Sequence, residues 1–447
     1  MPLFSRRRLQ SMLDELSPLM GPEKARDLLA RLENKRVDQV LPAEIELALI
    51  WSMATLGELE IEPLWWGDGS RPDVYTEFLI VGEPVAIEIA APNDNVINGE
   101  EAMDRVAQQI GSFVSHLQKG EGNYLRYRFR EMSGYEGGKY FRRRLAPDQY
   151  ELSAAAETVI RDWVERGETN IKALRIVEPG LDVEVERTPY KQTRFHNTWS
   201  TMPPETHSLE DNPLYKLLSR KLRQLKAARP GTKRVIFLGD AGSTLINRLG
   251  TLGEIDPTRR RVSGFEIISH FVTANQRAVD AVITFSPVRS GSWNTLDKKL
   301  RWAAKAFNRP GFTFPMVALE RIRQAMPRPR FEGYQARSLF RQGLFNPAAR
   351  GWWEATTISF RRGGPMEVRV SARSLIDLLA GRVTPEQFRS LSGERPGEKN
   401  LFQHQLDSGK TVQGVRFESG GVDFEDDHII VTFADDPSAR KLRLNSE

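Results

Sequence analysis

Residues 71–92, RPDVYTEFLIVGEPVAIEIAAP, constrain the fold of this 447-residue chain more than any other stretch. Two apolar runs flank Gly82-Glu83-Pro84, a pattern that predicts two β-strands joined by a tight turn. Asp73 opens the first strand, and Glu88 lies near the end of the second. Such carboxylates are costly to bury unless they are paired or bind a metal, and a divalent cation removes the repulsion between them. The hairpin therefore predicts a site built on Asp73 and Glu88.

Pro72-Asp73, a spacer and Glu88-Ile89-Ala90 resemble the PD-(D/E)xK motif of the restriction-endonuclease-like nucleases on its usual β-hairpin. Apolar spacing predicts a helix over residues 42–56, and residues 60–62 are typical of the next strand. A further helix is predicted from about residue 100 to 118. The resemblance covers residues 42–117 and implies an α/β fold, a mixed sheet flanked by helices.

The same resemblance implies which residues carry the chemistry. Asp73 and Glu88 would bind Mg²⁺ or Mn²⁺, and Glu46 on the first helix, with Glu44 as second choice, would complete the site. Gln108 on the helix after the hairpin would lie near the metal, and the alternative is a glutamine that faces solvent. The chain departs from the motif at Ala90, where the family has a lysine. If the protein cuts, another side chain must supply that contact: Gln108 and Gln109 are the first candidates, and Lys221 is a further alternative.

Charge is distributed unevenly along a chain whose net charge is +5. Residues 212–234 hold eight Lys or Arg and no acid, whereas residues 418–437 hold seven acids and no Lys or Arg. A basic segment of this kind predicts an anionic partner, DNA or alternatively RNA. The acidic segment is expected either to repel that partner or to pack on basic protein surface.

Two segments are candidates for nucleic-acid contact. Residues 212–228 predict an amphipathic helix whose charges all have one sign, and the alternative is a merely solvated face. Residues 120–145 interleave arginine, which contacts phosphate, with aromatic rings, which stack on bases. The alternative here is a half-buried strand in which Leu125, Tyr127 and Phe129 alternate with arginines. The predicted nucleic-acid-binding residues are Arg126, Arg128, Arg130, Arg142, Arg143, Arg220, Arg223 and Lys226.

The length predicts more than one domain. We expect a helical lead-in over residues 1–38 and a nuclease-like domain over 39–290, with an insertion at about 119–211. Strands at 233–238 and 278–285 would complete its sheet. A connecting region over 291–365 and a small α+β module over 366–447 would follow.

The chain has no cysteine, which excludes disulfides and thiolate zinc sites and suits a reducing cytoplasm, the location that we predict. No apolar run approaches the roughly 18 residues of a membrane span, and no signal peptide is recognised. The six histidines lack the spacing of a zinc site. No membrane partner is therefore expected.

These observations predict a metal-dependent DNA endonuclease. The resemblance implies a role in bacterial restriction or anti-phage defence, as a homo-oligomer or with partner proteins of a defence complex. The alternative, favoured by Ala90, is a catalytically degenerate nuclease fold that acts as a nucleic-acid-binding or assembly subunit.

Overall fold

The computed structural model describes residues 3–34, 36–66, 71–94, 99–166, 173–188, 198–200, 205–247, 249, 261–290, 299–341, 357–360, 366–385, 388 and 401–436. The chain divides into two compact units. The larger contains Leu16–Gly343, and the smaller combines Leu3–Glu15 with Leu344–Glu447.

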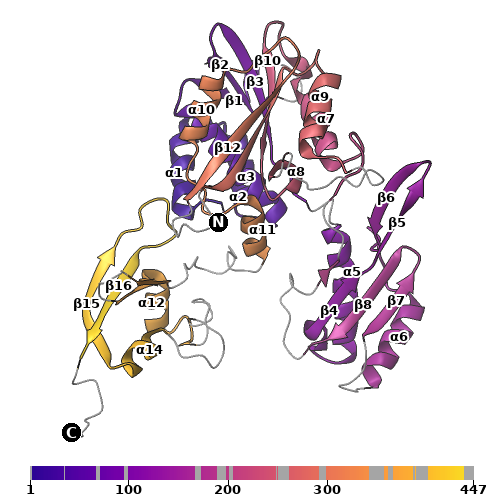
Figure 1. The fold of residues 1–447 in the computed structure, drawn as a ribbon, viewed down its shortest axis with the longest axis vertical. Helices are drawn as coiled ribbons and strands as arrows, with labels where there is room; N and C mark the ends of the chain where they lie inside the picture. The colour runs from indigo at the N-terminus through magenta and orange to yellow at the C-terminus, as the bar shows by residue number, and fades with distance from the viewer. Residues whose placement is uncertain are drawn as a thin grey trace, which may run out of the picture. The chain divides into compact units, whose positions relative to one another are not determined.

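A six-stranded mixed sheet forms the core of the larger unit, with strand order β1-β2-β3-β10-β11-β12 (Figure 1). β3, β10 and β11 run parallel to one another, whereas β1, β2 and β12 are antiparallel to their neighbours. The expected α/β architecture with a mixed sheet is therefore confirmed. The strands span Leu59–Ile61 (β1), Val74–Ile80 (β2), Glu83–Ala90 (β3), Lys233–Gly239 (β10), Ala281–Ser290 (β11) and Lys299–Asn308 (β12).

The β2–β3 hairpin closes through a two-residue turn. Ile80 pairs with Glu83, which leaves Val81 and Gly82 between the strands. Gly82 has φ = 74°, a left-handed conformation that glycine adopts without steric cost. The predicted turn is thus present, with Pro84 already inside β3.

Helices cover both faces of this sheet. On one face, α3 contacts β3 and β10 so closely that a Cβ on Gly239 would lie 2.1 Å from Ile45 Cγ2. On the other face, α7 and α9 pack on Ala86, Ala90 and Ile236. The helices span Pro22–Leu32 (α2), Val37–Ala54 (α3), Pro213–Gln224 (α7), Thr244–Asn247 (α8), Gly264–Ala274 (α9), Met316–Ala325 (α10) and Gly333–Arg341 (α11), with 3₁₀ turns at Ser17–Leu19 (η1), Leu64–Trp66 (η2) and Leu225–Ala227 (η4).

An insertion between β3 and α7 has a core of its own. A sheet of order β7-β8-β4-β9 packs with α5 and α6, and β5 and β6 form a separate hairpin. The apolar stripe of α5 belongs to this core, so the insertion begins earlier than expected. Its elements are α5 (Glu100–Leu117), η3 (Glu121–Tyr124), β4 (Leu125–Phe129), β5 (Glu131–Glu136), β6 (Lys139–Arg144), α6 (Ala154–Glu165), β7 (Leu174–Glu178), β8 (Leu181–Arg187) and β9 (Thr198–Trp199).

The smaller unit is built around an antiparallel sheet of order β13-β14-β16-β15. Its acidic segment packs on basic protein surface, because Arg7 pairs with Asp427 and Arg8 with Asp423, each at 2.9 Å. The elements are α1 (Arg6–Leu16), β13 (Thr357–Phe360), β14 (Met366–Ser371), α12 (Ala372–Leu379), α14 (Leu401–Asp407), β15 (Lys410–Glu418) and β16 (His428–Asp435).

Two boundaries differ from the expectations. β12 and α10 fall in the segment expected to connect two domains, yet β12 pairs with β11 along ten residues of each strand. The expected lead-in is divided, with most of α1 in the smaller unit and α2 in the larger. In the part of the chain that the structure describes, no helix combines the length and apolarity needed to cross a bilayer.

Candidate functional site

The β2–β3 hairpin brings the two predicted carboxylates together. Val74 pairs with Ile87, and this antiparallel register places Asp73, one residue before β2, opposite Glu88. Asp73 Oδ2 accepts a hydrogen bond of 2.7 Å from the Ile89 amide, and the Glu88 side chain is completely buried.

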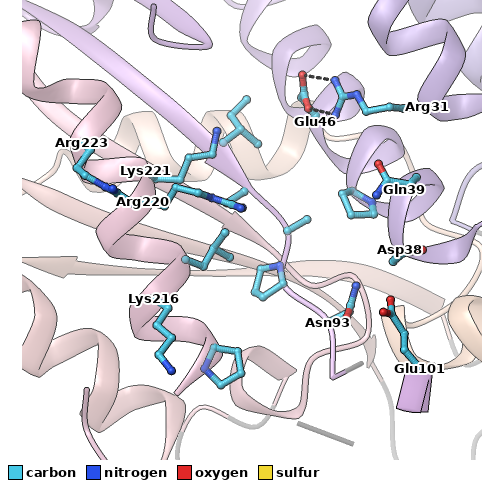
Figure 2. Close-up of a pocket in the computed structure, with 17 residues that line it drawn as sticks. Arg31, Asp38, Gln39, Glu46, Asn93, Glu101, Lys216, Arg220, Lys221 and Arg223 are labelled. Atoms are coloured by element: carbon cyan, nitrogen blue, oxygen red, sulfur yellow. Dashed lines mark hydrogen bonds and ion pairs between the residues drawn. The ribbon is translucent and has the colours of Figure 1, made fainter. Parts of the chain in front are cut away.

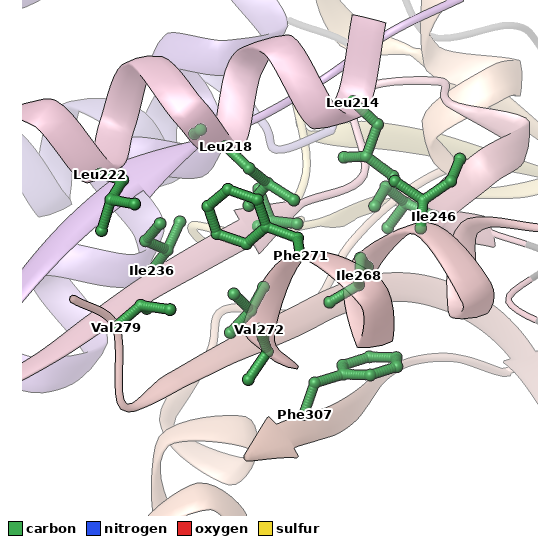
Figure 3. Packing of buried hydrophobic residues seen from close by; sticks show 14 of the residues in the cluster. Leu214, Leu218, Leu222, Ile236, Ile246, Ile268, Phe271, Val272, Val279 and Phe307 are labelled. Carbon is green, nitrogen blue, oxygen red and sulfur yellow. The ribbon is translucent and has the colours of Figure 1, made fainter. Parts of the chain in front are cut away.

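An ammonium group from α7 bridges these carboxylates. Lys221 Nζ lies 2.7 Å from Glu88 Oε2 and 3.2 Å from Asp73 Oδ2. The helix is held over this face of the sheet by its apolar stripe, and Figure 3 shows Leu218 of α7 packed beside Phe271 of α9. The packing that buries this stripe therefore also fixes the position of Lys221.

Ala90, at the lysine position of the resembling motif, lies under the same helix. Its side chain is buried in one cluster with Leu214 and Leu218 of α7. The small residue leaves room for α7 to approach β3 closely, and Lys221 from that helix reaches the carboxylates instead. The structure thus places Lys221, which the sequence offered only as a further alternative, against both carboxylates.

The two glutamine candidates lie elsewhere. The structure places Gln108 on an exposed face of α5, a helix whose apolar side packs inside the insertion. Gln109 Nε2 donates a hydrogen bond to the Tyr150 carbonyl. The helix that covers the hairpin is α7, not α5, which is why these glutamines are not assembled with Asp73 and Glu88.

Glu46 points inward, as the resemblance implies, but both of its carboxylate oxygens already bind cations. Arg31 forms a bidentate pair with it, at 2.8 Å to Oε2 and 3.1 Å to Oε1. Lys24 Nζ lies 2.7 Å from Glu46 Oε1 and 3.6 Å from Asp73 Oδ1. Glu46 is therefore linked to the hairpin through an ammonium group. Glu44, the second choice, is fully buried.

Burial and like charge act together on the carboxylates. Burial raises the pKa of Glu88 to about 9, and repulsion from Asp73 adds to the rise, whereas Lys221 opposes it. Burial also acts to raise the pKa of Asp73, but Lys221, Lys24 and the Ile89 amide outweigh it, so this pKa lies below its ordinary value. The pair therefore holds a proton to higher pH than isolated carboxyls do, which is expected of two acids that share one site.

A pocket of about 710 Å³ opens beside these residues, at the carboxyl end of β3. Figure 2 shows basic side chains of α7 on one side and residues of α2 and α3 on the other. Arg220 and Arg223 have no acidic partner among the described residues, whereas Lys216 pairs with Asp211 at 2.6 Å. The lining residues are Arg31, Asp38, Gln39, Pro42, Glu46, Ile89, Ala90, Ala91, Pro92, Asn93, Glu101, Pro213, Lys216, Leu217, Arg220, Lys221 and Arg223.

The arginines predicted in the insertion have a different environment. On β4, Leu125, Tyr127 and Phe129 are buried, so Arg126 and Arg130 lie on the outer face of a half-buried strand. Arg126 and Arg128 stand opposite Glu186 and Glu184 of β8, and Arg130 pairs with Glu184 at 3.0 Å. On the β5–β6 hairpin, Arg142 pairs with Glu131 at 2.9 Å, and Arg143 lies over the Phe141 ring. Lys226 of η4 is exposed.

Asp73 and Glu88 are the two carboxylates that the hairpin offers to a metal ion. Among the described residues, no three His, Asp or Glu side chains gather closely enough to hold an ion. Mg²⁺ commonly takes only one or two carboxylates and completes its shell with water and substrate phosphates. Glu88 Oε1 is buried and has no hydrogen-bond partner in the described part of the chain. An added ion could bind this oxygen once the carboxyl pair has lost its proton.

Comparison with family models, with curated proteins and with solved structures found no match to this chain. The description of the site therefore depends on the contacts between its own residues.

Lys24 and Arg31 are site residues that the sequence analysis did not identify. A signal for Lys24 was present, because helical spacing places it in line with the buried residues Leu28 and Leu32. Lys221 likewise falls three residues after Leu218 and four before Leu225, within an apolar stripe. A lysine at a stripe position predicts a buried charge that needs an acid.

Proposed function

We propose that this chain is a divalent-metal-dependent phosphodiesterase that hydrolyses nucleic acid, with DNA as the expected substrate. The observation that carries the proposal is the bridge from Lys221 on α7 to Asp73 and Glu88, beside a pocket lined by Arg220 and Arg223. Two adjacent carboxylates and a lysine are the groups that metal-assisted phosphoryl hydrolysis needs.

Asp73 and Glu88 would hold the ion. Mg²⁺, when bound, lowers the pKa of water and stabilises charge on the phosphate. Arg220 and Arg223 would bind non-bridging phosphate oxygens and so align the strand along α7. Water then adds to phosphorus and the ester P–O bond breaks, which gives a phosphate monoester and a hydroxyl.

In this scheme Lys221 acts as a hydrogen-bond donor. A lysine ordinarily has a pKa near 10.4, so its ammonium is charged at neutral pH. Interaction with Asp73 and Glu88 raises the pKa of Lys221 further, against the effect of burial. The group therefore donates hydrogen bonds to the phosphate oxygens as negative charge develops, and it does not act as a base.

The decisive experiment combines cleavage and ion binding. Wild-type chain is incubated with plasmid DNA, single-stranded DNA and RNA, each with Mg²⁺, Mn²⁺ or EDTA, and Mn²⁺ binding is measured separately. Cleavage should need the metal, and Asp73→Ala/Glu88→Ala should abolish both cleavage and Mn²⁺ binding. Asp38→Ala/Glu101→Ala, which removes two acids from the lining of the same pocket, is the matched control.

Cleavage that survives in the Asp73→Ala/Glu88→Ala chain would place the active site elsewhere. Mn²⁺ binding without cleavage of any substrate would instead support the second candidate, a nucleic-acid-binding or assembly subunit. That candidate is favoured by Ala90 and by the saturation of Glu46 with two cations. Restriction or anti-phage defence is the biological role that fits either outcome.

A further inference from the structure

Lys24 on α2 is the second ammonium group of the site. Its side chain is only 8% exposed and lies in line with the buried Leu28 and Leu32 of the same helix. Its Nζ lies 2.7 Å from a carboxylate oxygen of Glu46, 2.7 Å from one of Glu62 and 3.6 Å from Asp73 Oδ1. Three carboxylates from three different segments therefore converge on one cation.

The backbone around Glu62 adopts an uncommon conformation that supports this contact. Glu62 is the one residue other than glycine with positive φ in the described part of the chain, at 48°. Its amide donates a hydrogen bond of 3.3 Å to the Asp73 carbonyl. Such conformations persist where the surroundings fix them. Here the chain holds the Glu62 carboxylate against Lys24 and fixes the start of β2 at the same time.

Asp73 consequently lies between two cations. Oδ1 faces Lys24, whereas Oδ2 faces Lys221 and the Ile89 amide. Phosphodiesterases with two metals hold the ions about 3.5–4 Å apart, and together they stabilise the attacking and leaving oxygens. In this chain, an ammonium lies on each side of Asp73. Lys24, on the Oδ1 side, is bound by two further carboxylates, Glu46 and Glu62, whereas Lys221 has only Glu88 besides Asp73. The Oδ1 side is therefore the one that an ion would enter less readily.

We propose that Lys24 takes the place of a second metal ion, so that this site binds one divalent cation, on the Glu88 side of Asp73. The inference rests on the proposed function and assigns Lys24 as a positioning residue that acts through Asp73 and Glu46. Removal of Lys24 should open a second ion position between Glu46 and Asp73.

The test is the number of Mn²⁺ ions bound per full-length chain, measured by equilibrium dialysis with detection of free Mn²⁺ by electron paramagnetic resonance. Wild type should bind one ion and Lys24→Met two, the second more weakly. Arg26→Met removes the same charge from an exposed position of the same helix, and this control should bind one.

Lys24→Met removes a buried cation that three acids share, so a second variant guards against misfolding. Lys24→Met/Glu62→Gln removes one positive and one negative charge, keeps Glu46 and Asp73, and should also bind two ions. Two ions on wild type, or one ion on every folded Lys24 variant, would overturn the inference while leaving the proposed function intact. No ion on wild type would overturn the proposed function itself, and the inference with it.

Discussion

Helix α7 and strand β4 both alternate basic with apolar residues, but their cations have different surroundings. On β4, Arg126 and Arg128 stand opposite glutamates of β8, and Arg130 pairs with one of them. On α7, Lys221 turns toward two sheet carboxylates, and Arg220 and Arg223 line a pocket without an acidic partner among the described residues. The two segments therefore differ in whether an acidic side chain lies opposite each of their basic side chains.

A basic segment predicts an anionic ligand only where the fold leaves its charge uncompensated. Across an antiparallel pair, opposite charges supply local stabilisation of the sheet. Cations of one sign on one helix repel one another unless an anion is near. α7 is therefore the better candidate of the two for the proposed contact with nucleic acid, and β4 is better explained as one strand of a small sheet with charged residues on its outer face.

The largest expected effect concerns the inward-facing cation of α7. Lys221→Ala removes the donor beside Glu88 and Asp73, so the cleavage rate at saturating Mg²⁺ should fall roughly 10²–10³-fold. Mn²⁺ binding should persist because both carboxylates remain. Lys216→Ala, which removes an exposed lysine paired with Asp211 on the same helix, should leave the rate nearly unchanged. Equal rates for the two variants would remove Lys221 from the mechanism.

An intermediate effect is expected from the outward cations of α7. Arg220→Ala/Arg223→Ala/Lys226→Ala should weaken DNA binding for all sequences alike. Each lost phosphate contact should flatten the slope of log affinity against log salt by about 0.9, so the triple variant should lose up to about 3. Fluorescence anisotropy over a salt series measures both quantities.

The matched control for that variant is Arg126→Ala/Arg128→Ala/Arg130→Ala, which removes the same charge from β4 and from the residue that follows it. Its affinity and salt slope should change much less, because glutamates of β8 already face these arginines. An equal loss in both variants would show that net charge alone governs binding, and the distinction between α7 and β4 would not hold.

The smallest expected effect concerns an ion pair in the sheet of the insertion. Asp182 of β8 is bonded to Arg175 of β7 at 2.7 Å, and this hydrogen bond holds the pKa of Asp182 below its ordinary value. A lowered carboxyl pKa gives stability that is present at neutral pH and is lost as pH falls through the folded-state pKa. Arg175→Ala should therefore lower the unfolding midpoint slightly at pH 7, and the difference should vanish in acid. A difference that grows on acidification would contradict this sign.

The local parts of the site were accessible from sequence. Asp73 and Glu88 lie on two strands joined by a two-residue turn, so alternation and turn chemistry suffice to place them together. The parallel strands β10 and β11 were likewise evident as buried apolar runs. The hairpin depends on residues that are close together in the sequence, and each buried strand is recognised from its own apolar residues.

The remaining parts depend on packing between distant segments. The pattern of α5 is that of any amphipathic helix, and nothing in it says that its stripe belongs to the insertion and not to the central sheet. The sequence pattern therefore favoured Gln108 of α5 over any residue of α7. Lys24 and Arg31 lie on a helix whose only apparent role was to precede the fold. Their contacts with Glu46 follow from how α2 packs on α3.

The position of the insertion also sets the order in which the site is completed during synthesis. Lys221 lies 133 residues after Glu88 in the chain, whereas Lys24 precedes the hairpin. At about 5–20 residues per second, the ribosome delivers Lys221 on the order of ten seconds after the hairpin. The nascent hairpin can pair with Lys24 from the start, but α7 must still emerge and dock. The bridge from Lys221 to the two hairpin carboxylates can therefore form only after the whole insertion has been translated.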